Sequence, residues 1–173
     1  MLLAVKAMVL LQAAAAGLAP WGLRAVKPEA VLGGKIAVAE WKKAENKSTC
    51  APVAFAFTGS AGEGAAPRRA NFSGGWAVAF DQPNKRSAFG IAGAGVEGSD
   101  EDTARWPHQK QYPDGSSAGW GLEGDTGPGW LGYVHIASQG CLYNIWSNLG
   151  RAHLEFLLGQ IRYVETAVAS KKA

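Results

Sequence analysis

The sequence predicts an α+β fold in which an antiparallel sheet of about five to six strands carries a short N-terminal helix and a C-terminal amphipathic helix packed on it. Large apolar residues alternate with alanine or glycine through the middle of the chain, and turn residues separate these segments. The apolar spacing then changes to three and four residues near the C-terminus. With 173 residues, 47% hydrophobic and 18% charged, the chain fits one globular domain.

The first 19 residues have the layout of a secretory signal peptide. A basic residue, Lys6, precedes an apolar run over 7–16, and Ala14–Ala16 offers the small residues of a cleavage site. An uncleaved anchor and a buried helix are the alternatives, because the segment is only just long enough to span a bilayer. We therefore expect a periplasmic or secreted protein, or else one that contacts the membrane only through residues 1–19.

The domain boundaries follow from the same changes in composition. We expect residues 20–35 to form a linker, residues 36–165 a single α+β domain and residues 166–173 a flexible tail. Good helix formers fill the stretch 36–44, which ends in a polar break and predicts the short N-terminal helix.

The first strands are expected where large residues alternate with alanine or glycine, at 53–57, 75–80 and 87–93. The turn residues Pro83 and Asn84 predict that the last two segments form an antiparallel hairpin. This alternation gives the sheet one bulky face and one flat face of alanine and glycine. A helix or another backbone can approach such a flat face closely, so we expect both faces to be covered.

A second hairpin is expected where the strand formers of 130–137 and 141–147 flank the turn residues 138–140. Beyond it, apolar residues at helical spacing predict an amphipathic helix that Ser147 or Asn148 can cap. The apolar positions of this helix are Leu149, Leu154, Leu157, Leu158, Ile161 and Val164.

The two cysteines, Cys50 and Cys141, are expected to form a disulfide, because an even cysteine count in an exported chain favours the oxidised state. The alternative is a small secreted hydrolase that uses Cys141 as its nucleophile, with His135 or His153 as the base. However, Cys141 begins a stretch of strand formers and lacks the helix N-terminus that would activate a thiol. The disulfide is therefore preferred, and enzymatic activity is disfavoured.

The candidate binding region is the stretch 97–129, which we expect to be a long aromatic-rich loop. The candidate ligand- or partner-binding residues are Trp106, His108, Tyr112, Trp120 and Trp130. Aromatic side chains can stack on a sugar or anchor a protein partner, although they can also simply cover a sheet. The expected function is that of a non-catalytic binding or accessory protein with an unknown protein, small-molecule or saccharide partner. A membrane-tethered accessory subunit is the alternative if residues 1–19 are retained.

Other functional classes receive little support. The formal charge is +3, and basic residues are interleaved with acidic ones, so nucleic-acid binding is not expected. The G-x-G-x-x-G match at 93–98 runs into acidic residues that would repel a phosphate. The acids at 97–102 lack the full pattern of a calcium loop, and the three histidines are dispersed. We therefore expect neither a metal nor a cofactor.

Overall fold

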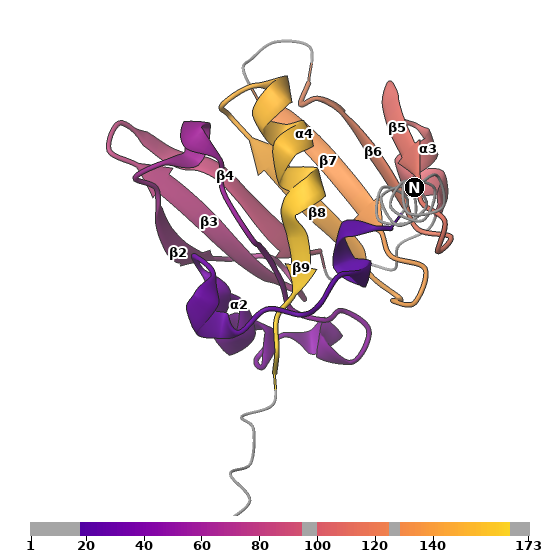
Figure 1. The fold of residues 1–173 in the computed structure, drawn as a ribbon, viewed down its shortest axis with the longest axis horizontal. Coiled ribbons are helices and arrows are strands. Elements are labelled where there is room, and N and C mark those ends of the chain that lie inside the picture. The colour runs from indigo at the N-terminus through magenta and orange to yellow at the C-terminus, as the bar shows by residue number, and fades with distance from the viewer. Residues whose placement is uncertain (1–17, 95–99, 125–128, 167–173) are drawn as a thin grey trace, which may run out of the picture.

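The computed structural model describes residues 18–94, 100–124 and 129–166, which form two antiparallel sheets with a few helices (Figure 1). This arrangement agrees with the expected α+β class in broad terms. The expected signal or anchor at 1–19 and the tail at 166–173 lie almost wholly outside the described residues. No helix within the described ranges is both long and apolar enough to cross a bilayer.

The larger sheet has seven strands in the order β2-β3-β4-β8-β7-β6-β5, with every neighbouring pair antiparallel. Both expected hairpins are confirmed, as β3–β4 and β7–β8. The prediction of five to six strands was wrong because β2 and β5 show no alternation of large apolar residues and β6 lies in the stretch that we expected to be a loop. The strands are β2 (Ala66–Ala70), β3 (Trp76–Gln82), β4 (Lys85–Gly93), β5 (His108–Gln111), β6 (Ser117–Leu122), β7 (Trp130–His135) and β8 (Leu142–Ser147).

The smaller sheet pairs β1 (Val53–Phe55) with β9 (Ile161–Tyr163). The strand expected at 53–57 therefore forms, but it is shorter and does not join the main sheet. Phe57 lies beyond its end with 71% of its surface exposed.

The C-terminal helix, α4 (Arg151–Gln160), is shorter than expected at both ends. It begins after Gly150, whose φ of 97° favours glycine, so neither predicted residue is its N-cap. The Ser147 hydroxyl instead accepts the Leu149 amide proton just before the helix, at 3.1 Å. The helix ends before Ile161 because the following backbone groups pair with β1, and Gly159 weakens the last turn.

The N-terminal part of the described chain belongs to the packed fold, although we expected a linker at 20–35. Trp21 is buried with its ring 4.7 Å from that of Tyr112, and its indole nitrogen donates to Asp114 at 2.9 Å. The remaining helices are η1 (Pro20–Gly22), η2 (Pro28–Ala30), α2 (Gly34–Trp41), η3 (Glu45–Ser48), η4 (Ser60–Gly62) and α3 (Asp100–Ala104).

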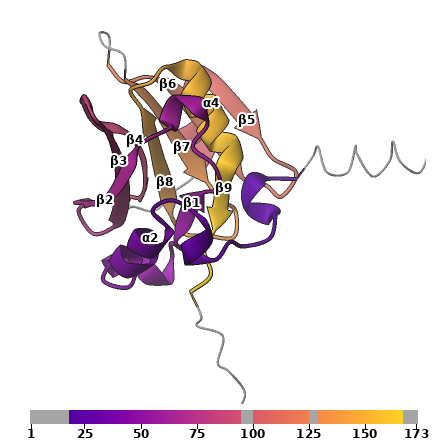
Figure 2. The same ribbon diagram turned by 60° about the vertical axis from the view of Figure 1, so that its left-hand side comes forward.

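The hydrophobic core lies on the bulky face of the main sheet, which α4, α2 and the β1–β9 pair cover together (Figures 1 and 2). The rings of Phe80 and Phe89 stack with centroids 4.6 Å apart, and Phe55 of β1 packs against both. Leu154 and Leu157 of α4 are fully buried against this layer. The predicted bulky face is therefore filled by side chains from every element that crosses it.

The expected disulfide between Cys50 and Cys141 is confirmed, with 5.1 Å between the two Cα atoms. It ties the segment before β1 to the residue that precedes β8. A disulfide is compatible with an exported protein.

Candidate ligand-binding groove

The opposite face of the main sheet is the predicted flat face, and α3 covers part of it. A Cβ atom at Gly119 of β6 would overlap the Thr103 carbonyl of α3, so glycine is required for this close approach. On the neighbouring strand, Gly132 points the other way, toward Leu154 and Leu158 of α4. The two helices therefore lie on opposite faces of the sheet.

A hydrogen-bond network fastens α3 to the sheet. The Asp100 carboxylate accepts from the His135 ring Nδ1 at 2.9 Å and from the Ser117 hydroxyl at 3.0 Å. These bonds, the one from His135 first, hold the pKa of Asp100 below its usual value. The Thr103 and Ser117 hydroxyls also bond to each other at 2.7 Å. Asp100 thus positions a helix, and the described residues contain no cluster of acids, histidines and cysteines that could hold a metal.

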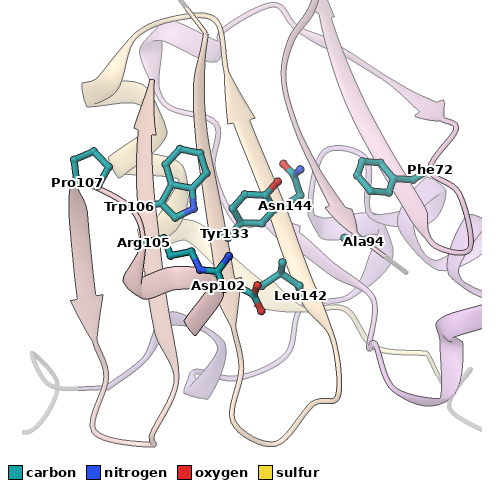
Figure 3. Close-up of a pocket in the computed structure, with 9 residues that line it drawn as sticks. All are labelled: Phe72, Ala94, Asp102, Arg105, Trp106, Pro107, Tyr133, Leu142 and Asn144. Atoms are coloured by element: carbon teal, nitrogen blue, oxygen red, sulfur yellow. The ribbon is translucent and has the colours of Figure 1, made fainter. Parts of the chain in front are cut away.

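Beside α3 the flat face is hollowed into a groove of about 680 Å³ (Figure 3). Tyr133 of β7 and Asn144 of β8, which are directly opposite each other in the strand register, form its floor. Trp106 stands on one side and Phe72 on the other, as Figure 3 shows. The groove is lined by Phe72, Ala94, Asp102, Arg105, Trp106, Pro107, Tyr133, Leu142 and Asn144.

The aromatic wall of the groove consists of Trp106 and Tyr133. Their ring centroids are 5.5 Å apart and their planes are inclined at 43°. Burial raises the pKa of the Tyr133 hydroxyl, and the nearby carboxylates of Glu123 and Asp102 raise it further. The hydroxyl therefore stays protonated at neutral pH and can both donate and accept a hydrogen bond.

Asn144 places a buried polar atom at the groove floor. Its side-chain oxygen is buried and finds no hydrogen-bond donor among the described residues. An unsatisfied buried acceptor costs about 1–3 kcal/mol. Asn144 lines the groove, and a small rotation of its amide would bring this oxygen within reach of a donor on a bound ligand, which would remove the cost.

The five aromatic residues predicted from the sequence are divided between the two faces. Only Trp106 lines the groove. On the face that α4 covers, the His108 ring lies 5.9 Å from the rings of both Trp120 and Trp130. Tyr112 is buried beneath Trp21.

The prediction of a loop at 97–129 was wrong, because this stretch contributes α3, β5 and β6.

The Trp120 indole and the Arg151 guanidinium both donate to one oxygen of Glu155, at 2.9 and 2.7 Å. These contacts attach α4 to the sheet. A smaller cleft of about 320 Å³ lies beside them, and its lining includes Tyr112, Trp120 and Glu155.

The structure also shows the surroundings of Cys141 and His153, the other candidate catalytic residues. Cys141 is engaged in the disulfide and has no free thiol for a hydrolase mechanism. His153 is buried, where Ser147 donates to its Nδ1 at 2.8 Å and its Nε2 donates to the Thr58 carbonyl at 2.9 Å. Of the G-x-G-x-x-G match, only Gly93 and Ala94 lie within the described residues.

Comparison of the chain with protein-family models, with curated proteins and with solved structures gives no significant match. The geometry of the groove is therefore the basis for a functional proposal.

Sequence reasoning missed most of the groove. Phe72, Tyr133 and Asn144 were not among the predicted site residues, nor were Asp102 and Arg105. One signal was present: Tyr133 and Asn144 are large residues at positions of two predicted strands that face away from the core. Finding them required the register between those strands.

Proposed function

We propose that the protein is an exported, non-catalytic binding protein that holds its ligand in the groove on the flat face of the sheet. The observation that carries this proposal is an aromatic wall placed beside a buried acceptor that lacks a partner. Ligand sites typically combine apolar walls with a few placed polar groups in this way.

The composition of the groove supports binding over catalysis. The described residues that line it include no serine, cysteine, histidine or lysine, which are common nucleophiles and bases. The charged side chains are Asp102 of α3 and Arg105, the residue after α3, and they have opposite signs. Such groups can orient a ligand without reacting with it.

The signal-like layout of residues 1–19 and the Cys50–Cys141 disulfide support export. N-terminal sequencing and intact-mass measurement of the protein from the exported fraction would test it. We expect a new N-terminus close to Ala16 and a mass two hydrogens below that of the reduced chain. Retention of residue 1 would favour the membrane-tethered alternative.

The binding site is tested by NMR titration of the ¹⁵N-labelled protein. The panel would contain neutral oligosaccharides, nucleosides, aromatic acids and short peptides. We expect the amide shifts of a hit to map to Tyr133 and Asn144. Trp106→Ala and Tyr133→Ala should each weaken that binding about tenfold or more, because central aromatic contacts dominate recognition.

The matched control is Phe156→Ala, which removes an exposed ring from α4 on the other face of the sheet. It should leave ligand affinity unchanged. The groove variants should lower the free energy of unfolding by no more than about 1.5 kcal/mol, since both rings are only partly buried. Hits that map to the Trp120 cleft, or that survive both groove substitutions, would contradict the proposal.

A further inference from the structure

We infer that the ligand of the groove is a neutral saccharide and that Asn144 recognises one of its hydroxyl groups. This inference rests on the proposed function and names the chemical class of the ligand. It follows from the charge, the ring geometry and the hydrogen-bonding capacity of the groove.

The charges of the groove favour an uncharged ligand. Asp102 lies on α3 and Arg105 directly follows that helix, and both side chains line the same groove. A phosphate or carboxylate near Arg105 would also meet the Asp102 carboxylate, and a cation near Asp102 would meet the guanidinium. A neutral ligand can bond to both groups without this repulsion.

The aromatic geometry favours a ligand that rests on an open platform. Trp106 and Tyr133 pack against each other at 43°, so they leave no slot between parallel rings for a planar heteroaromatic group. They present one continuous aromatic surface beside Asn144 and Leu142 (Figure 3). The C–H face of a sugar ring provides an apolar surface that suits such a wall.

The hydrogen-bonding groups of the groove differ in kind. Arg105 only donates, the Asp102 carboxylate only accepts, and the Tyr133 hydroxyl can do both. Asn144 contributes the buried oxygen that needs a donor. Because each sugar hydroxyl donates one bond and accepts two, a saccharide can bond to groups of all these kinds by rotating its hydroxyls.

The width of the groove favours more than one sugar unit. Trp106 stands beside Tyr133 on β7, whereas Ala94 follows β4, two strands away in the sheet order β4-β8-β7. Neighbouring strands are about 4.8 Å apart, so the groove spans about 10 Å. Phe72 stands beyond β4 and offers a second ring for the far end of an oligosaccharide.

The key variant is Asn144→Leu, which keeps the approximate shape of the side chain and removes its buried oxygen. We expect it to raise the thermal midpoint of the free protein by about 2–4 °C, because it removes an unsatisfied acceptor. It should also weaken saccharide binding about 10- to 100-fold. A residue with only a structural role would not raise stability and lower affinity together.

The matched control is Asn148→Leu. The Asn148 side chain donates to the Ser87 carbonyl at 3.0 Å, so this substitution removes a bond that is made. It should lower the thermal midpoint and leave saccharide binding unchanged. If Asn144→Leu prevents folding, Asn144→Ala provides the same affinity test.

The experiment screens the full chain, as exported, on an array of neutral oligosaccharides of glucose, galactose, mannose, xylose and N-acetylglucosamine. Isothermal titration with the best glycan then compares the native protein with Asn144→Leu and Asn148→Leu. We expect a di- or oligosaccharide to bind more tightly than its monosaccharide. Equal affinity of the native protein and Asn144→Leu would overturn the role of Asn144.

The outcomes separate this inference from the proposed function. If no neutral glycan binds at millimolar concentration but a peptide or nucleoside from the NMR panel depends on Trp106, the saccharide inference fails and the groove remains the site. If a glycan binds and neither Asn144→Leu nor Trp106→Ala weakens it, the groove itself is not the site.

Discussion

The two faces of the main sheet are built from the same alternating strands, but they differ in what fills them. On one face, Phe80, Phe89 and their neighbours pack against α4, α2 and β1 as the hydrophobic core. On the other, Gly119 lets α3 approach the sheet closely, and the groove lies beside that helix. Side chains fill the first face, whereas on the second a helix docked at one glycine leaves room beside it for a groove.

The largest effect is expected on the filled face. Phe89→Ala removes a fully buried ring that contacts Phe80, Phe55 and His153. It should lower the free energy of unfolding by about 3–5 kcal/mol, measured by chemical denaturation. A loss below about 1 kcal/mol would mean that this face is not the core.

A smaller effect, with a larger functional consequence, is expected where α3 meets the flat face. In Gly119→Ala the new methyl group would overlap the Thr103 carbonyl, so α3 must move together with the Trp106 side of the groove. The expected loss of stability is about 1–3 kcal/mol. Binding to the groove should be largely lost in the NMR titration.

Gly132→Ala is the matched control on the neighbouring strand. Its new methyl group would lie 3.5 Å or more from Trp120, Leu158 and Leu154, at ordinary contact distances. It should be neutral or stabilise the fold by about 0.5–1 kcal/mol, and binding should persist. Equal behaviour of the two variants would contradict the proposed difference between the faces.

The smallest effect is expected from acidification, and it should act on the filled face. Burial lowers the pKa of His153 below its usual value of 6.5. Because the folded state then binds the proton less readily than the unfolded state, stability is complete above about pH 6.5 and decreases as the pH falls below it. Thermal unfolding between pH 7.5 and 5 would show this decrease.

His153→Gln provides the comparison for the pH series, since its midpoint should vary less over the same range. The carboxylates of Asp81, Asp100 and Asp114 do not interfere, because their pKa values are lowered and they remain ionised throughout. A midpoint that rises on acidification would show that the sign is wrong.

Local signals in the sequence were sufficient for part of the fold. The turn residues Pro83 and Asn84 predicted the β3–β4 hairpin. The even number of cysteines in a chain with a signal-like start predicted the Cys50–Cys141 disulfide. Each of these rests on residue chemistry that acts over a short stretch or on a simple count. The polar strand β5, with the sequence His-Gln-Lys-Gln, gave no such signal because it is an edge strand with mostly exposed side chains.

The groove could not be predicted because its residues come from separate parts of the chain. Phe72, Trp106, Tyr133 and Asn144 meet only after β4 has paired with β8 and α3 has docked on Gly119. Strand order and register create this proximity, and neither follows from local alternation. Of the aromatic residues predicted to bind a ligand or partner, all except Trp106 lie outside the groove.

The pairing of β4 with β8 determines how a bound ligand would affect unfolding of the protein. This seam joins a three-stranded half, β2-β3-β4, to a four-stranded half, β8-β7-β6-β5. Phe72 and Ala94 belong to the first half, whereas Tyr133, Asn144 and Trp106 belong to the second or to its α3 flank. A ligand in the groove would therefore contact both halves of the sheet and stabilise their pairing. Slower proteolysis of the protein in the presence of a ligand would then show that the groove is occupied, before any affinity is known.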